Sequence, residues 1–467
     1  MSKKSTDTLI RKKSGSKVPH ILLIIAGLVL VACLLTYIAP AGLYDLDESK
    51  RAIPGTFKYV ENTPVNPWQA LLMIKAGVQN AGAIIALLLV TGGAIQTIIS
   101  TGAFEELLNY GIYKLKDHSV TILVPAIAVL MSVIGCFAGV DSLIAFVTVG
   151  IVICKRLKLD RIVAMAMFYL SYIIGQGASF TSSLLMSFQG LAEVPLLSGM
   201  FLRFIIWLIF TGINAAYCTR YAMRISKDPG RSIVGEILQP DDDMEELGEV
   251  KFPVRAVIVI GVMFACYLFY SFCAKNYKWD YEQMMAIMTL DAVFSAAVYR
   301  LSPNGASKTF LAGAQSMGGI ALIMGCARVI GSVLTEGHII HTIAFHASNI
   351  IGSFGLAMAG LGIFIFTLLF NLIIPSGMSK AAIMFPLLTP IGDICNLTRQ
   401  VVCLAYQLGD SLTNTLTPLS GPLVGALGLA NVDYPKWLRY ALPLVGVLTV
   451  ISMIFVGITA AISWTGL

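Results

Sequence analysis

The chain contains one passage twice: GASFTSS, GLAEV and LRF follow one another within residues 177–204, and GDSLTNTLTP, GLANV and LRY do so within residues 409–440. Both copies open with a polar, glycine-rich stretch inside an otherwise apolar run. Such a break is tolerated at membrane depth only where it faces protein or a water-filled cavity. An apolar chain that repeats itself once at a long interval is typical of secondary transporters built from two halves.

The composition places the chain in a membrane. Of its 467 residues, 57% are hydrophobic and 12% are charged, whereas soluble domains carry about 25% charged residues. Apolar runs of about 20 residues, the length that crosses a bilayer, recur along the whole sequence. The net charge of +6 comes from short basic clusters between these runs, which indicates membrane anchoring rather than binding to nucleic acid. The sequence therefore predicts an all-α polytopic membrane protein.

The basic residues also predict an orientation. With the N-terminus in the cytoplasm, the segments expected on the cytoplasmic side hold most of the 32 Lys and Arg residues, as the positive-inside rule requires. AGVQ at 76–79 matches AGAQ at 312–315, and the spans that follow them, 78–100 and 314–335, run in opposite directions on this topology. We therefore expect two inverted repeats in a multi-pass protein of the plasma (inner) membrane.

The predicted organisation has five parts. These are a cytoplasmic N-terminal tail (1–18), repeat 1 (19–225), a cytoplasmic linker (226–253), a connecting span (254–282) and repeat 2 (283–467). Each repeat is expected to contain a broken transmembrane helix and two apolar arms that fold back at a polar tip. We interpret the paired arms, 119–157 and 352–394, as re-entrant hairpins. Two full crossings for each pair are the alternative.

The hairpin tips are expected to bind substrate. Glycine and proline end the first arm of each hairpin, and a new helix then begins. Its N-terminus offers free N–H groups and a positive dipole end to an anionic group. A simple turn between two spans is the alternative. The candidate substrate-binding residues at the tips are Gly139, Asp141, Ser142, Ser376, Gly377, Ser379 and Lys380.

The two breaks supply further candidates, and we place the second break at 409–415. Hydroxyl and amide oxygens suit a hard cation such as Na⁺ or a polar substrate; packing of Ser and Thr between helices is the alternative. The substrate candidates here are Ser179, Thr181, Asp410, Thr413 and Asn414. The ion-coupling candidates are Asp141, Ser182, Asp410 and Thr415, with Na⁺ or H⁺ as the coupling ion.

Charged residues within the membrane segments are functional candidates because burying them in a bilayer costs several kcal/mol. Lys380 could hold a substrate carboxylate, and Asp141 or Asp410 could hold an ammonium, Na⁺ or a proton. A Lys380–Asp410 pair that only fixes the scaffold is the competing interpretation. Asp291 and Arg328 lie mid-span, where they could pair structurally.

The sequence offers no sign of enzyme chemistry. It has no Walker A motif and no HExxH motif, so neither ATP-driven transport nor hydrolysis is expected. His338, His341 and His346 form the only metal-like pattern, and no acidic residue or cysteine nearby completes it. The nine cysteines include no CxxC pair. We expect no resident cofactor and no metal site.

Four motifs carry a family resemblance: TYIAPAG at 36–42, PSG at 375–377, PLLTPIGD at 386–393 and QLGD at 407–410. Here the chain resembles the YfcC/DcuC-like carriers of the ion-transporter superfamily, which include arginine/ornithine exchangers and C4-dicarboxylate carriers. The resemblance covers nearly the whole chain. It implies inverted repeats, two hairpins with substrate at the tips and broken helices, elevator-like movement and a homodimer.

The chain departs from that family at both tips. Related carriers often have two acidic residues at the first tip, where this chain has Val140 and Asp141. They often have Ser-Gly-Gln at the second, where it has Met378, Ser379 and Lys380. Compared with those carriers, this chain has one carboxylate fewer and one positive charge more at its tips, which disfavours binding of a doubly basic substrate.

The sequence therefore predicts a secondary active transporter, either an exchanger or ion-coupled, for a small carboxylate-bearing solute. An amino acid or a C4-dicarboxylate fits this description. An arginine/ornithine-type basic amino acid antiporter is the alternative within the family. A passive channel is the alternative from another class.

Overall fold

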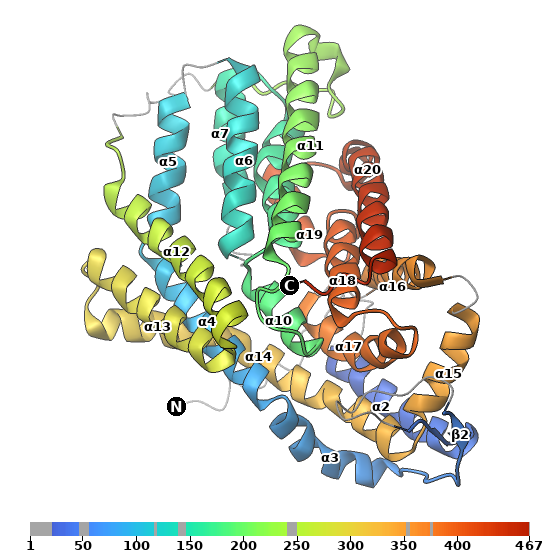
Figure 1. Cartoon of the computed structure of the whole chain (residues 1–467). Coiled ribbons are helices and arrows are strands. Elements are labelled where there is room, and N and C mark those ends of the chain that lie inside the picture. The colour runs from blue at the N-terminus through green and yellow to red at the C-terminus, as the bar shows by residue number, and fades with distance from the viewer. Residues whose placement is uncertain are drawn as a thin grey trace, which may run out of the picture.

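The computed structural model describes residues 21–45, 56–115, 119–138, 146–240, 250–351, 355–373 and 377–466, which are mostly helical (Figure 1). The elements as far as the loop after α11 are α2 (Ile21–Ile38), β1 (Gly42–Leu43), β2 (Lys58–Tyr59), α3 (Pro67–Asn80), α4 (Gly82–Ser100), α5 (Ala103–Leu115), α6 (Val120–Ala138), α7 (Val147–Leu157), α8 (Arg161–Met165), the π-helix η2 (Ala166–Leu170), α9 (Ser171–Gly177), α10 (Ser183–Leu191), α11 (Met200–Lys227) and the 3-10 turn η3 (Pro229–Arg231).

The rest of the described chain is entirely helical apart from its connections. Its elements are α12 (Val254–Tyr277), α13 (Tyr281–Val298), α14 (Pro303–Glu336), α15 (Ile340–Ile351), α16 (Gly355–Ile373), α17 (Gly377–Ile394), α18 (Arg399–Asn414), α19 (Gly421–Ala430) and α20 (Tyr434–Ala461). Seven of the described helices are long and apolar enough to cross a membrane. The predicted all-helical, polytopic class is confirmed.

The helices form two layers (Figure 1). In the first, which we call the α14 layer, α2, α3 and α4 pack on α14, α13 packs on α4, and α12 packs on α13. In the second, the α18 layer, α6 packs on α9 and α11, while α16 and α20 pack on α18. The layers touch where α17 meets α14 and where α10 meets α4.

Close glycine contacts hold the α14 layer together. A Cβ atom on Gly77 of α3 would lie 2.5 Å from the carbonyl oxygen of Gly325, and one on Gly313 would lie 2.4 Å from that of Gly92 in α4. Small residues let helix backbones approach this closely in membranes. Gly77 in α3 meets Gly325 of α14, whereas Gly92, which comes later in the chain, meets the earlier residue Gly313. α3 and α4 therefore run antiparallel to α14.

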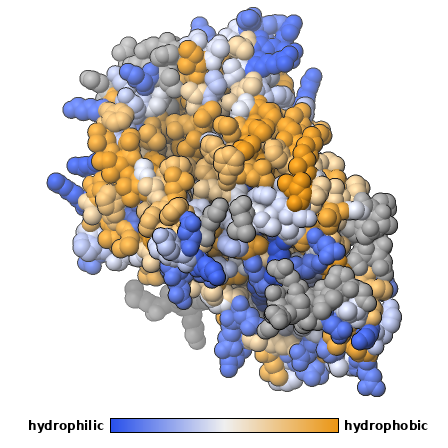
Figure 2. Space-filling view, in the orientation of Figure 1, coloured by the Kyte–Doolittle hydropathy of each residue, from blue (hydrophilic) through white to orange (hydrophobic). Residues whose placement is uncertain are grey.

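The surface suits a bilayer. A broad band of apolar residues crosses the face seen in Figure 2, with hydrophilic residues above and below it. Phe201 and Leu290 expose 77% and 69% of their surface. Side chains of this size, exposed in a continuous band, indicate contact with another apolar phase.

The α18 layer repeats one order of elements. A helix pair (α6 and α7, then α16 and α17) is followed by an interrupted helix and a long span. Asp160 and Thr398 accept hydrogen bonds at the starts of α8 and α18, and Ser182 and Ser420 precede α10 and α19. Asp160 and Thr398 are as far apart in the sequence as Ser182 and Ser420. The two copies therefore align at these positions.

This match corrects the predicted second break. α18 continues to Asn414, and the irregular backbone lies between Thr415 and Ser420. The polar residues 409–414 are helical, and the hydroxyl of Ser411 donates to the carbonyl of Leu408 in the same helix. The first break is nearer to its predicted place, since α9 ends at Gly177 and α10 starts after Ser182.

Two further expectations differ from the structure. The span predicted at 314–335 is part of the longer helix α14, because Ser302 caps a new start before Pro303. The proposed pair of Asp291 with Arg328 does not form: both carboxyl oxygens of Asp291 lack a hydrogen-bond partner, as does Nε of Arg328. The two residues lie on α13 and α14, which diverge from a short connection.

Candidate functional site

The two interrupted helices cross at Gly177 and Ser411. A Cβ atom on Gly177 would lie 2.0 Å from Cβ of Ser411, far inside ordinary contact between carbon atoms, so only glycine fits at this crossing. Nε2 of Gln407 in α18 donates hydrogen bonds to the carbonyl oxygens of Gly177 at 3.2 Å and Ser179 at 2.6 Å. The end of α9 is therefore held by the other copy of the repeat.

The buried side chain of Arg203 orients Gln407 at this crossing. Nε of Arg203 donates to Oε1 of Gln407 at 2.9 Å, and its other nitrogens donate to the carbonyl of Ser198 and the side chain of Gln400. Arg203 exposes 1% of its surface and lies over the ring of Trp464. The guanidinium fixes the amide of Gln407 in the orientation that lets it donate to the α9 carbonyls.

The first break also contacts the end of α6. The hydroxyl of Ser179 donates to the carbonyl oxygen of Cys136 at 2.8 Å, and that of Thr181 donates to the same oxygen at 3.3 Å. Ser182 accepts a hydrogen bond from the N–H of Leu185 as the N-cap of α10. All three hydroxyls are buried, and each is engaged with the backbone.

The last turn of α18, just before the second break, contacts the end of α16. Nδ2 of Asn371, near the end of α16, donates to Oγ1 of Thr413 at 2.8 Å and to Oδ1 of Asn414 at 2.9 Å. It also donates to the backbone carbonyl of Asp410. Asn371 is fully buried. It connects the hairpin arm to the last turn of α18.

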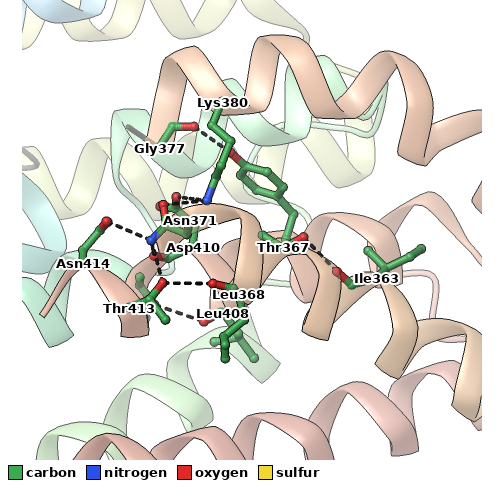
Figure 3. Close-up of polar contacts among 12 residues, drawn as sticks. Ile363, Thr367, Leu368, Asn371, Gly377, Lys380, Leu408, Asp410, Thr413 and Asn414 are labelled. Carbon is green, nitrogen blue, oxygen red and sulfur yellow. Dashed lines mark hydrogen bonds and ion pairs between the residues drawn. The ribbon is translucent and has the colours of Figure 1, made fainter. Parts of the chain in front are cut away.

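A buried ion pair completes this second cluster. Nζ of Lys380, on α17, lies 2.6 Å from Oδ1 of Asp410 on α18 and 2.8 Å from Oδ1 of Asn371. Figure 3 shows these three side chains pointing toward one another. Lys380 and Asp410 expose 0% and 2% of their surface. A charge buried this completely is tolerated only with a partner.

The start of α17 is fixed to α18 by two contacts. The hydroxyl of Tyr406 donates to the carbonyl of Gly377 at 2.7 Å (Figure 3), and Nζ of Lys380 lies 5.1 Å from the centre of its ring. A Cβ atom on Gly377 would lie 2.9 Å from Oδ2 of Asp410. The helix start therefore approaches the carboxylate closely, and a larger residue would push it away.

The predicted site residues fall into four groups. Lys380, Gly377, Asp410, Thr413 and Asn414 meet at the second cluster, and Ser179, Thr181 and Ser182 meet at the first. The hydroxyl of Thr415 donates to the carbonyl of Leu412 in its own helix. The predicted residues Gly139, Asp141, Ser142 and Ser376 lie outside the described residues, as does the side chain of Ser379.

Four side chains of the site were not predicted from the sequence: Asn371, Tyr406, Gln407 and Arg203. A signal existed for Asn371, which is the one amide in the apolar run of α16. A polar residue in such a run faces protein rather than lipid. Gln407 begins the quoted QLGD motif and Tyr406 precedes it, but nothing in the sequence indicates that they face the other copy of the repeat.

The histidines form no metal site in the described part of the chain, where no group of three metal-ligating side chains is present. Nδ1 of His341 accepts a hydrogen bond from the N–H of Tyr44 at 3.1 Å. Burial, together with the nearby His338, lowers the pKa of His341, so the imidazole is neutral at pH 7. It joins α15 to the loop that contains β1.

Comparison with known proteins identifies the family. The family model described as DcuC, C4-dicarboxylate anaerobic carrier, matches residues 18–461. A protein of Escherichia coli (strain K12) named "Putative basic amino acid antiporter YfcC" is 27% identical, over 94% of this chain and 95% of that protein. An uncharacterized protein of Haemophilus influenzae is 24% identical, over 86% of this chain and 80% of that protein.

Two solved structures share the fold. The YdaH transporter of Alcanivorax borkumensis superposes with a TM-score of 0.74 at 15% identity, over 96% of this chain and all of that one. MtrF of Neisseria gonorrhoeae, described among antimetabolite efflux pumps, superposes with a TM-score of 0.70 at 12% identity, over 96% of both chains. Because the family model spans nearly the whole sequence and the fold is that of solved transporters, this chain belongs to the DcuC family of C4-dicarboxylate carriers and is a multi-pass membrane transport protein.

Proposed function

We propose that the protein is a secondary active transporter for a small carboxylate-bearing solute, an amino acid or a C4-dicarboxylate. The observation that carries this proposal is the crossing of two interrupted helices beside a buried, charge-neutral polar cluster. Secondary transporters place their substrates at such interruptions near the middle of the bilayer.

The two halves are proposed to be inverted repeats. The antiparallel packing of α3 and α4 on α14 supports this, as does the matched capping of α8 with α18. We propose a re-entrant hairpin for each pair of arms, 119–157 and 352–394, because glycine or proline ends the first arm of each pair in the sequence.

We base the proposed transport movement on the arrangement of the helices in two layers. We place the substrate in the α18 layer, which holds both breaks and both hairpins, and expect this layer to move against the α14 layer as an elevator. The N-terminus is placed in the cytoplasm, in the plasma (inner) membrane, because of the distribution of basic residues. A homodimer held by the α14 layer is proposed from the family resemblance.

The charge balance of the site favours a substrate with a carboxylate. Lys380 neutralises Asp410 within the protein, so the second cluster presents no net negative charge to an incoming solute. The starts of the second hairpin arms add positive helix dipole ends. Thr413 and Asn414 lie beside the pair and would offer the polar contacts that orient the solute.

A basic amino acid antiporter is the second candidate, and the relationship to YfcC favours it. Its substrate would bring a guanidinium or ammonium group that needs a carboxylate. Asp410 could serve only if Lys380 moved away, because the two charges lie 2.6 Å apart. Asp141, outside the described residues, is the other carboxylate proposed for this role.

A thermal-shift screen of the purified protein distinguishes these candidates. C4-dicarboxylates and neutral, acidic and basic amino acids would each be added at matched ionic strength, because a ligand that binds the native state raises Tm. We expect a dicarboxylate or an acidic or neutral amino acid to stabilise the protein. Stabilisation by arginine and ornithine alone would establish the antiporter instead.

A matched pair of variants ties the result to the site. Thr413→Val removes a hydroxyl that accepts from Asn371, whereas Thr449→Val removes one that bonds only its own helix in α20. The ligand-induced shift should fall in the first variant and persist in the second. Equal shifts in both would place the substrate elsewhere.

A further inference from the structure

The ammonium group of Lys380 lies among oxygens of the kind that coordinate a hard cation. Its neighbours are a carboxylate oxygen of Asp410 and an amide oxygen of Asn371, at 2.6 Å and 2.8 Å. Carboxylate and carbonyl oxygens are the ligands that such cations prefer. The lysine reaches this position from α17, while its ligands come from α16 and α18 (Figure 3). One side chain therefore joins three helices as a bound ion would.

The charge balance of the cluster is complete without an added ion. In the described residues of the surrounding elements, α9, α10 and α16 contain no charged side chain. In α17 and α18, the other charges are Asp393 and Arg399, which pair with each other at the opposite end. Among the described residues, Asp410 thus has one positive partner and Lys380 has one negative partner. A cation bound beside them would leave this pair with an excess positive charge.

Several backbone carbonyls at and beside the breaks already accept hydrogen bonds from side chains. Those of the first break accept from Gln407, as described above. At the second break, Tyr169 donates to the carbonyl of Asn414 at 3.3 Å, the indole of Trp437 to that of Thr415 at 2.9 Å, and Tyr434 to that of Leu416 at 2.6 Å. Unwound carbonyls in transporters commonly bind Na⁺. In this protein, side-chain donors already hydrogen-bond to the carbonyl oxygens named above.

We propose that Lys380 occupies the position of a coupling cation, so that the start of α17 docks on α18 without Na⁺ and the protein retains a latent cation site at Asp410. This inference rests on the proposed transport function. It assigns a specific role to the pair: neutralising Asp410 lets the start of α17 dock on α18 beside Gly377 and Tyr406. It also predicts that a small cation will bind when the lysine charge is removed.

The role proposed for the Lys380–Asp410 pair differs from that of a pair that only stabilises the fold, and substitution of Lys380 distinguishes the two roles. A buried ion pair can often be replaced by apolar side chains without loss of stability, whereas removing one partner is strongly destabilising. Lys380→Met removes the charge and shortens the side chain by one atom, so the position of Nζ is left open. The carboxylate of Asp410 then lies buried without a partner. A cation from solution can take the place of Nζ, with Asp410 and Asn371 as its first two ligands.

Thermal stability measured in Na⁺ and in N-methylglucamine, at equal ionic strength, tests the proposal. The wild-type protein should have the same Tm in both salts. Lys380→Met should be less stable in N-methylglucamine and should regain roughly 3 °C at a Na⁺ concentration about one hundred times its Kd. The double variant Lys380→Met/Asp410→Asn removes both charges. It should fold, and its Tm should not respond to Na⁺.

The outcomes separate this inference from the proposed function. A Na⁺-specific rise in the Tm of the wild-type protein would overturn the inference, because the cation position would then be free. So would a Lys380→Met variant that stays unfolded or unresponsive in Na⁺ although the double variant folds. Failure of the wild-type protein to transport any carboxylate would instead refute the function. The thermal result would still decide whether Lys380 fills a cation position.

Discussion

Replacing Gly177 with alanine tests how closely the two interrupted helices must approach. The added Cβ atom would lie 2.0 Å from Cβ of Ser411, whereas carbon atoms in contact prefer about 3.5–4.0 Å. The helices must therefore separate by more than an ångström at this crossing. Overpacking of this kind costs about 1–3 kcal/mol, which corresponds to a fall in Tm of roughly 1–3 °C for a chain of 467 residues.

The separation should affect transport as well as stability. Gln407 bonds the carbonyls of Gly177 and Ser179 across the crossing, so these bonds stretch when the helices move apart. We expect substrate-induced stabilisation and uptake both to fall. The measurements are Tm by thermal shift and the initial rate of uptake into liposomes, normalised to the reconstituted protein.

Two controls make the test specific. Gly212→Ala, on the exposed side of α11, places its Cβ where nothing lies within 4 Å, so its Tm should hold or rise slightly through better helix propensity. The double variant Gly177→Ala/Ser411→Gly removes the opposing Cβ and should recover most of the lost stability. Wild-type stability and uptake in Gly177→Ala alone would refute the predicted crossing.

Two further variants test buried polar groups, each by its Tm. Asp291→Asn should hold or raise Tm, because neither carboxyl oxygen has a hydrogen-bond partner and the residue exposes 2% of its surface; a loss of about 3–5 kcal/mol, typical of a broken buried ion pair, would contradict this. Gln407→Leu should cost about 1–3 kcal/mol by leaving the guanidinium of Arg203 and the carbonyl of Ser179 without their partner. An unchanged Tm in Gln407→Leu would show that the contact across the repeat contributes little.

The sequence predicted the class of fold because hydropathy and the internal match carry that information directly. The polar stretch near 177–183 was correctly predicted as a break, since Gly177 ends one helix and Ser182 caps the next. The second break was predicted too early in the sequence, because residues 409–415 were matched to the first break by their polar composition. In the structure the caps Ser182 and Ser420 define the match, and Asp410 lies inside a continuous helix.

The candidate site was predicted in part for a similar reason. Lys380 and Asp410 stand out in an apolar sequence because an intramembrane charge needs a partner, and they do pair. The role of Asn371 depends on how α16 packs against α18, which no local pattern encodes. The same holds for Asp291 and Arg328, whose opposite charges suggest a pair that the divergence of their helices prevents.

Counterflow in liposomes tests the central claim, that this chain is a carrier whose site is exposed to one side of the membrane at a time. Liposomes containing the purified protein would be loaded with an unlabelled solute found by the thermal-shift screen, then diluted into a trace of the labelled solute. The account predicts a transient accumulation of label above its equilibrium level, absent in Asp410→Ala. Label that only approaches equilibrium, at a rate that does not saturate, would identify a channel and contradict the account.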